Sequence, residues 1–311
     1  MSKAAPAIEH IPVMAAELVA ALDVVAGGSY VDCTVDGGGH ASVVLEASAP
    51  GGRLLGIDAD PRAVRSAERR LGSWKGVFAL ANDNFSNLVE VCAAHGFAAV
   101  NGVYFDLGLS APQLEESERG FSFQREAALD MRFSDRQVMT AADIVNTYPV
   151  DDLARVLWTY GEERRSRSIA RRIVSHRPVR TTTELADLVR RAVPGGRQRI
   201  HPATRTFQAL RICVNEELVN LETALKQTLD VLGHGGRVVV MSYHSLEDRL
   251  VKRWFQQEST DCLCPPEVPV CVCGHKATLR LVTKRVVTPS SDEIAMNPRS
   301  RSAKLRAAAF L

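Results

Sequence analysis

The chain has 311 residues, of which 46% are hydrophobic and 24% charged, with a net charge of +2. This composition is typical of a soluble globular protein with one large or two modest domains. No apolar run approaches the roughly 20 residues of a membrane span, and residues 1–10 lack the apolar core of a secretion signal. These observations argue against a membrane or secreted protein and predict a cytoplasmic one.

The first predicted elements are a helix over residues 15–22 and a buried strand over residues 29–33, which contains Asp32. The strand leads into Gly37, Gly38, Gly39 and His40, and then into a helical start at residues 41–46. A strand, a glycine turn and a helix in succession are typical of nucleotide-binding α/β domains. The turn lacks the G-x-G-x-x-G spacing of nicotinamide sites; an acidic first strand with a looser glycine turn fits a methyltransferase better. A glycine loop without a ligand stays open.

A second buried strand, residues 53–58, ends in Asp58, which lies 19 residues after Gly39. That spacing is close to the ~20 residues expected for a carboxylate that binds ribose hydroxyls. A helix from Pro61 to residue 70, a strand at 77–81, a helix at 86–95 and a strand at 102–106 follow. The alternation predicts a parallel sheet whose ligands bind beyond the carboxyl ends of the strands. Asp32, Asp58, Phe85 and Asp106 all fall at or just past those ends.

The alternation stops after Asp106, and residues 114–214 show mainly helical periods, at 141–145, 150–160, 164–175 and 183–192. We expect an all-helical subdomain, inserted between a first core part at 1–113 and a second at 215–311. Residues 155–211 contain 14 Arg, no Lys and four acids. This local excess of +10 favours RNA as a partner, because guanidinium groups grip phosphate oxygens in pairs. A solvated helical face with internal salt bridges is the alternative.

The second core part is predicted to contain helices at 215–232 and 245–257 and a strand at 237–242. Two final strands, at 277–282 and 303–308, are expected to form an antiparallel edge pair, and residues 290–302 to form a polar loop.

Seven cysteines, an odd number, argue against a disulfide framework in a cytoplasmic protein. Cys33, Cys92 and Cys213 lie in apolar surroundings and are expected to be buried thiols. The other four share a 14-residue segment with His275, namely Cys262, Cys264, Cys271 and Cys273. Their C-x-C spacing is tighter than the usual C-x₂₋₄-C of zinc sites. A structural zinc ion and free or redox-labile thiols both stay open, and no metal ligand is included in the predicted site.

Several short motifs occur together in this chain, spread over most of its length. They are DLG at 106–108 with Ser110, PQL at 112–114, ERGFSF at 118–123, LDMR at 129–132, YGEER at 160–164, HPATRTFQ at 201–208, HSLEDR at 244–249 and NPRSRS at 297–302. On these motifs the chain resembles the RsmH (MraW) family of bacterial methyltransferases, which use S-adenosylmethionine on a cytosine of 16S ribosomal RNA.

The resemblance implies a Rossmann-like class I methyltransferase sheet with a helical, RNA-facing insert, and methyl transfer to N4 of a cytidine in 16S rRNA of the small ribosomal subunit. It implies that the cofactor is held by Gly38, Gly39, His40, Asp58, Phe85, Asp106 and Gln113. Two positions depart from the family: Val35-Asp36 replaces a more frequent Phe-Gly pair, and Ala111 replaces a second serine. A homodimer is compatible with the sequence, which leaves the oligomeric state open.

The exocyclic amine of cytosine is a poor nucleophile because its lone pair is delocalised into the ring. An enzyme can accept hydrogen bonds from the amine and align it with the methyl donor. Asp106 and Ser110 are the candidate acceptors, and His244 is the candidate proton acceptor. Asp106 could instead only bind cofactor, and His244 could be a structural hydrogen-bonding group. A ribosome-assembly factor without turnover and a nicotinamide oxidoreductase are the alternative functions.

Overall fold

The computed structural model describes residues 12–109, 113–114, 117–193, 201–265, 267–268 and 270–311. The chain divides into two compact units. The first comprises Met1–Gly108 and Asn220–Leu311, and the second comprises Leu109–Val219. The sequence placed the insert at 114–214, so the second unit extends five residues further at each end.

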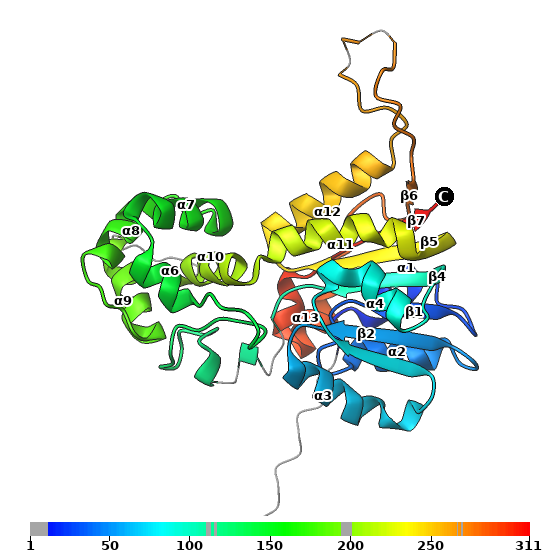
Figure 1. Cartoon of the computed structure of the whole chain (residues 1–311), viewed down its shortest axis with the longest axis horizontal. Helices are drawn as coiled ribbons and strands as arrows, with labels where there is room; N and C mark the ends of the chain where they lie inside the picture. The colour runs from blue at the N-terminus through cyan, green and yellow to red at the C-terminus, as the bar shows by residue number, and fades with distance from the viewer. Residues whose placement is uncertain (1–11, 110–112, 115–116, 194–200, 266, 269) are drawn as a thin grey trace, which may run out of the picture. The chain divides into compact units, whose positions relative to one another are not determined.

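The first unit is built on a seven-stranded sheet of order β3-β2-β1-β4-β5-β7-β6 (Figure 1). Strands β1 to β5 are parallel, whereas β7 is antiparallel to both β5 and β6, as the expected edge pair requires. This mixed sheet confirms the predicted Rossmann-like fold. The strands are β1 Ser29–Asp32, β2 Arg53–Asp58, β3 Phe78–Asn82, β4 Val100–Asp106, β5 Leu232–Ser242, β6 Leu279–Leu281 and β7 Lys304–Phe310.

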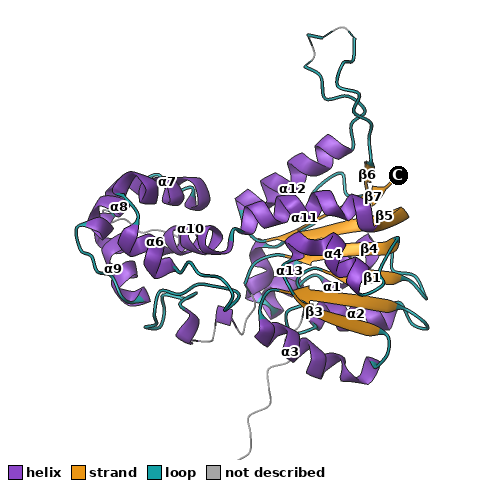
Figure 2. Cartoon of the chain, in the orientation of Figure 1, coloured by secondary structure: helices purple, strands orange, loops and turns teal. Residues whose placement is uncertain are grey.

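Helices pack on both faces of the sheet (Figure 2). One hydrophobic cluster joins strand residues such as Val103 and Val240 to Leu88, Leu225 and Phe255 of the helices on that face. The other cluster lies on the opposite face, because side chains alternate along a strand. The helices of this unit are α1 Ala15–Leu22, α2 Gly39–Ala47, α3 Pro61–Arg70, α4 Leu88–Ala94, α11 Glu217–Val231, α12 Ser245–Glu258 and α13 Ser291–Met296, with 3-10 turns η1 Leu71–Trp74, η2 Phe85–Asn87 and η4 Pro298–Ser302. None of the described helices is long and apolar enough to cross a membrane.

The boundary between the units falls within α11, since Glu217 to Val219 belong to the second unit. β5 begins at Leu232, five residues before the predicted strand, because it continues directly from α11. Gly233 and Gly236 allow this, since a Cβ at either position would lie 2.8 Å from a backbone oxygen of Ala99 or Val100.

The prediction of a polar loop at 290–302 is wrong. These residues form α13 and η4. Ser290 caps α13, because its Oγ accepts a hydrogen bond from the Glu293 N–H at 3.1 Å. Glu293 in turn accepts a hydrogen bond from the Met14 N–H at 2.7 Å, so this segment is fixed to the chain that begins α1.

The regular elements described in the second unit are helices, apart from an isolated β-bridge between Ala128 and Thr181, and residues 120–140 form a loop that contains Ala128. Its helices pack around buried residues such as Leu153, Leu157 and Ile169. They are η3 Ser117–Arg119, α6 Ala141–Thr147, α7 Val150–Gly161, α8 Ser166–Val174, α9 Thr182–Ala192 and α10 Ala203–Asn215. α6 and α9 each begin with a capping box, at Thr140 with Asp143 and at Thr181 with Glu184.

Candidate cofactor and active site

Three carboxylates lie at one edge of the sheet. Asp32, Asp58 and Asp106 end β1, β2 and β4, which are adjacent and parallel, so their carboxyl ends meet at the same edge. Asp58 and Asp106 each raise the pKa of Asp32 by charge repulsion, which places Asp32 within electrostatic range of both. The sequence predicted this edge as the ligand site, and the structure brings the three carboxylates together there.

The glycine turn connects β1 to α2 and is fixed by its surroundings. Gly38 is the N-cap of α2 with φ 78°, in the left-handed region that favours glycine. A Cβ at Gly38 would lie 3.2 Å from Ala67 Cα, so this glycine is needed for packing against α3. Gly39, the first residue of α2, would place a Cβ 3.4 Å from Pro12 Cβ. The local packing therefore accounts for Gly38 without a ligand, and contact of Gly38 and Gly39 with cofactor stays a prediction.

Asp58 is held in one orientation by two backbone groups. Its Oδ2 accepts a hydrogen bond from the Asp36 N–H at 2.9 Å, and its Oδ1 accepts one from the Asp60 N–H at 2.8 Å. Asp36, the residue that departs from the family pattern, adopts φ 43°, which Asp tolerates better than most residues. Each carboxylate oxygen has a second lone pair, so Asp58 can still accept two hydroxyl hydrogen bonds. Burial raises the pKa of Asp58 to about 7, although the hydrogen bonds from the two N–H groups act in the opposite direction and lower it.

The sequence analysis placed Asp32 at a ligand-binding strand end but did not include it among the predicted cofactor residues. Its side chain is only 1% exposed, and its Oδ1 accepts a hydrogen bond from the Thr34 N–H at 3.1 Å. Burial raises the pKa of Asp32 to about 8, an effect that the neighbouring Tyr104 hydroxyl offsets only in part. Its Oδ2 has no hydrogen-bond partner among the described residues. The Tyr104 hydroxyl oxygen, which lies close enough to lower this pKa, likewise has no hydrogen-bond partner among the described residues, and a buried polar pair of this kind can accommodate a donor from a ligand.

Asp106 is held by contacts from three elements. Tyr243 follows β5, and its hydroxyl donates a hydrogen bond to Asp106 Oδ1 at 2.7 Å. His40 Nδ1, from α2, lies 3.3 Å from Oδ2. The Asp106 N–H donates to Thr34 Oγ1, after β1, at 2.6 Å. Tyr243 and Thr34 were missed by the sequence analysis; the available signal was their position just after strands that neighbour β4.

His40 was predicted to bind cofactor, but in the structure it is 7% exposed and already engaged. Its Nε2 lies 2.8 Å from the carbonyl oxygen of Val13, and its Nδ1 faces Asp106. Both ring nitrogens therefore face acceptors, an arrangement satisfied by an imidazolium ion or by a proton shared with Asp106. These contacts favour a role in orienting Asp106.

Phe85 begins η2, just beyond β3, and its ring packs edge-on against Phe105 of β4, with ring centroids 5.7 Å apart. Phe85 is half-buried, so part of the ring remains available for stacking on a base. The adenine contact predicted for Phe85 remains a prediction.

His244 is the N-cap of α12. Its Nδ1 accepts a hydrogen bond from the Glu247 N–H at 3.4 Å, and the Glu247 carboxylate accepts one from the His244 N–H at 3.2 Å. Because Nδ1 acts as an acceptor, the proton of a neutral ring lies on Nε2, which is 3.0 Å from Glu247 Oε1 without good hydrogen-bond geometry. The contacts favour the structural alternative, and the role of proton acceptor stays a prediction.

Ser110 lies outside the described residues. Gln113 belongs to the second unit and is half-buried. Cys213 is half-buried in the second unit, so its predicted full burial is wrong, whereas Cys33 and Cys92 are buried as expected.

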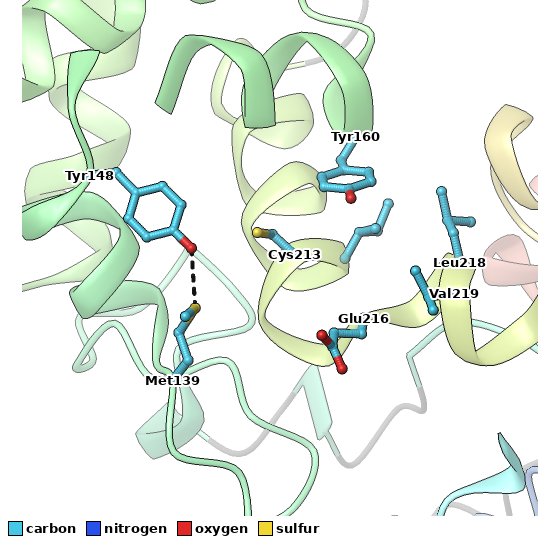
Figure 3. A pocket seen from close by; sticks show the side chains of 8 residues that line it. Met139, Tyr148, Tyr160, Cys213, Glu216, Leu218 and Val219 are labelled. Atoms are coloured by element: carbon cyan, nitrogen blue, oxygen red, sulfur yellow. Dashed lines mark hydrogen bonds between the residues drawn. The ribbon is translucent and has the colours of Figure 1, made fainter. Parts of the chain in front are cut away.

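A hollow of about 200 Å³ opens on the second unit, between α6, α7, α10 and the start of α11 (Figure 3). Figure 3 shows the rings of Tyr148 and Tyr160 and the Glu216 carboxylate around it, with the Tyr148 hydroxyl bonded to the Met139 sulfur at 3.4 Å. None of the predicted cofactor residues lines this hollow.

Two sets of arginines in the second unit differ in their contacts. Arg155, Arg190 and Arg211 form ion pairs with Asp152, Asp187 and Glu217. A second group is exposed on or before α8 and forms no ion pair with the part of the chain that the structure describes, namely Arg164, Arg165, Arg167 and Arg171. Arg197 and Arg199 lie outside the described residues. The charge excess is therefore only partly balanced by internal pairs.

Comparison with known proteins covers nearly the whole chain. The chain is 58% identical over 299 residues to ribosomal RNA small subunit methyltransferase H of Dehalococcoides mccartyi strain 195, covering 96% of this chain and 86% of that protein. It is 51% identical to the enzyme of the same name from Thermomicrobium roseum, over 96% of this chain and 93% of that protein. An rRNA methylase structure from Streptococcus thermophilus matches with a TM-score of 0.40 and 10% identity, over 96% and 93% of the two chains, which is too distant to add to the assignment.

The family model described as the MraW methylase family matches residues 7–311. The chain belongs to the MraW methylase family.

Proposed function

We propose that this protein transfers a methyl group from S-adenosylmethionine to the exocyclic N4 amine of a cytidine in 16S rRNA of the small ribosomal subunit, and that Asp106 accepts a hydrogen bond from that amine. Membership of the MraW methylase family supports the reaction and the cofactor. The observation that carries the assignment of residues is the Asp106 carboxylate, held by Tyr243 and His40 at the carboxyl edge of the sheet.

The residues at this edge fit the cofactor. Its sulfonium and ammonium groups are positive; Asp106 and the ionised fraction of Asp58 supply negative charge at the strand ends, whereas Asp32, with its pKa raised to about 8, is mostly protonated at neutral pH. The unsatisfied Oδ2 of Asp32 and the remaining lone pairs of Asp58 provide acceptors for amine and ribose hydroxyl donors. When bound, the cofactor supplies an electrophilic methyl group on sulfur, already activated for transfer.

The chain's own contribution is to position and polarise the amine. Tyr243 and His40 hold the two Asp106 oxygens in position, and each oxygen of a carboxylate can accept more than one hydrogen bond. An N–H of the target amine that donates to Asp106 increases electron density on nitrogen as the new bond to carbon forms. Asp106 can then take the proton that the nitrogen loses, because a fixed acceptor at hydrogen-bond distance acts as a general base.

The second unit is proposed to bind RNA. Its exposed, unpaired arginines on and before α8 suit phosphate contacts. The rRNA substrate follows from the family, while its presence within the small subunit and action in the cytoplasm are parts of the proposal. A homodimer stays a prediction.

The test compares Asp106→Asn with Tyr243→Phe. Transfer of labelled methyl groups to small-subunit rRNA gives turnover, and calorimetry gives the dissociation constant of S-adenosylmethionine. We expect Asp106→Asn to lower turnover at least about 100-fold, within the range of a lost acid–base group, a larger effect than its weakening of cofactor affinity. Tyr243→Phe removes one hydrogen bond to a charged group, about 1.5–3 kcal/mol, and should cost about 10- to 100-fold.

Normal turnover in Asp106→Asn together with weakened cofactor binding would restrict Asp106 to cofactor binding. Absence of methyl transfer by the unaltered protein, with RNA binding intact, would instead favour an assembly factor without turnover.

A further inference from the structure

The described residues between α12 and β6, at 259–265, 267–268 and 270–278, extend from the first unit in a long loop, which we call the cysteine arm (Figure 1). Its base is closed by Glu258 and Thr278. The Thr278 N–H donates to the Glu258 carbonyl oxygen at 2.8 Å, and the Thr278 hydroxyl donates to the Glu258 carboxylate at 2.8 Å. No residue of the proposed methyl-transfer site lies in this arm.

The arm brings four thiols together, those of Cys262, Cys264, Cys271 and Cys273. Their sulfur atoms all lie within 4.8 Å of one another. Cys271 and Cys273 Sγ are 3.6 Å apart, and Cys273 and Cys262 Sγ are 3.9 Å apart. A disulfide would need about 2.05 Å, so these are separate thiols. Zinc binds sulfur at about 2.3 Å, so the edges of a tetrahedral Zn(Cys)₄ site measure roughly 3.8 Å, a spacing that both sulfur–sulfur distances match.

The backbone around the thiols is arranged in a crossed pattern. Leu263, between the first two cysteines, donates its N–H to Cys273 Sγ at 3.3 Å. Val272, between the last two, donates its N–H to Cys264 Sγ at 3.4 Å. Each C-x-C pair therefore directs an N–H at a sulfur of the other pair. Such donors stabilise negative charge on sulfur, which is the form that binds metal.

The arm has no hydrophobic core of its own. None of its described residues is buried, and its apolar side chains point to solvent, with Val270 71% and Val272 80% exposed. Because the arm buries no apolar side chains, apolar burial cannot hold it in a fixed conformation. Small folds without a hydrophobic core depend instead on a cross-link or a metal. The four thiols are the only group in the described arm that can supply one.

We propose that Cys262, Cys264, Cys271 and Cys273 bind a structural zinc ion that holds the cysteine arm in its conformation. Four thiolates fill the tetrahedral coordination of Zn²⁺ and leave no open position, so the site is structural. His275 is not a ligand, since its Nε2 lies 3.1 Å from the Gln257 carbonyl oxygen and it is absent from the group of neighbouring ligand atoms.

The test measures metal content in the full-length protein, purified without chelators from zinc-supplemented medium. We expect about one zinc ion per chain, at least a tenfold loss in the double variant Cys262→Ser/Cys273→Ser, and no change in Cys213→Ser, the control thiol outside the arm. Replacement of zinc by Co²⁺ should produce the intense thiolate-to-cobalt and ligand-field absorption of a tetrahedral sulfur site. Cofactor binding by the double variant checks that the sheet still folds.

Removal of zinc by a chelator should increase protease cleavage within residues 259–278 and leave the sheet uncut. The proposal is overturned if the reduced protein, reconstituted with Zn²⁺, holds less than about one-tenth of an ion per chain. It is equally overturned if the double variant keeps its zinc, or if freshly isolated protein contains disulfides between these four cysteines.

Discussion

The carboxylate of Asp58 gives the cofactor site a pH dependence that can be measured. Burial raises its pKa to about 7. The two backbone N–H groups that orient it leave lone pairs for two ribose hydroxyls. An ionised carboxylate accepts these hydrogen bonds more strongly than a protonated one. We therefore expect the affinity for S-adenosylmethionine to rise with pH as Asp58 loses its proton.

The size of the effect follows from the pKa. With a pKa of about 7, roughly one-tenth of Asp58 is ionised at pH 6 and roughly nine-tenths at pH 8. The dissociation constant of S-adenosylmethionine should therefore be about tenfold higher at pH 6 than at pH 8, a difference of about 1.4 kcal/mol in binding free energy. Asp58→Asn removes the charge and one acceptor, so it should weaken binding at pH 8 by about 10- to 100-fold, given 1.5–3 kcal/mol for hydrogen bonds to charged groups.

Isothermal titration calorimetry of both proteins at pH 6, 7 and 8 measures this. The α-amino group of the cofactor also titrates near pH 8, and so does Asp32, but both act in the variant as well. The ratio between the two proteins therefore isolates Asp58. The reasoning is refuted if Asp58→Asn retains the same tenfold dependence, or if the unaltered protein binds equally well at pH 6 and pH 8.

Two further outcomes are expected. Folded Asp32 keeps its proton up to about pH 8, whereas the unfolded chain loses it near pH 3.8, so the free energy of unfolding should fall as pH rises between these values. Asp32→Asn should remove this fall. Its free energy of unfolding in urea should exceed that of the unaltered protein by at most about 6 kcal/mol at pH 8 and show no gain near pH 4. Replacing four exposed arginines by Gln should reduce the slope of log K against log[salt] for rRNA binding, measured by filter binding, by about 0.7 for each phosphate that is no longer neutralised; the four are Arg164, Arg165, Arg167 and Arg171. The control Arg155→Gln/Arg190→Gln, in which both residues are ion-paired, should change this slope little. Equal effects of the two variants would contradict the assignment.

The core sheet was predictable because its signals are local. Short apolar runs that end in Asp32, Asp58 and Asp106 mark strands whose carboxyl ends must meet in a parallel sheet. The prediction of a loop at 290–302 was wrong because it relied on a composition rich in Pro, Ser and Arg. It did not use the helix-capping signal from Ser290 to Glu293.

The contacts within the site were less predictable, because they join residues far apart in the sequence. Tyr243 meets Asp106 across 137 positions, and only the adjacency of β4 and β5 brings them together. His244 lies beside Tyr243 in the sequence, but its ring Nδ1 accepts a hydrogen bond from the Glu247 N–H in the first turn of the helix that follows. The type of residue indicated chemistry at both positions, whereas only the fold determined which partner each side chain would have.

The point at which the second unit enters the chain has a consequence for how such enzymes diversify. Without Leu109–Val219, the chain would pass from β4 through the rest of α11 to β5, an ordinary right-handed crossover. The additional domain is thus accommodated within one connection between β4 and β5, and these two strands pair with each other directly. A lineage could therefore exchange one inserted domain for another at this junction while it retained the same sheet.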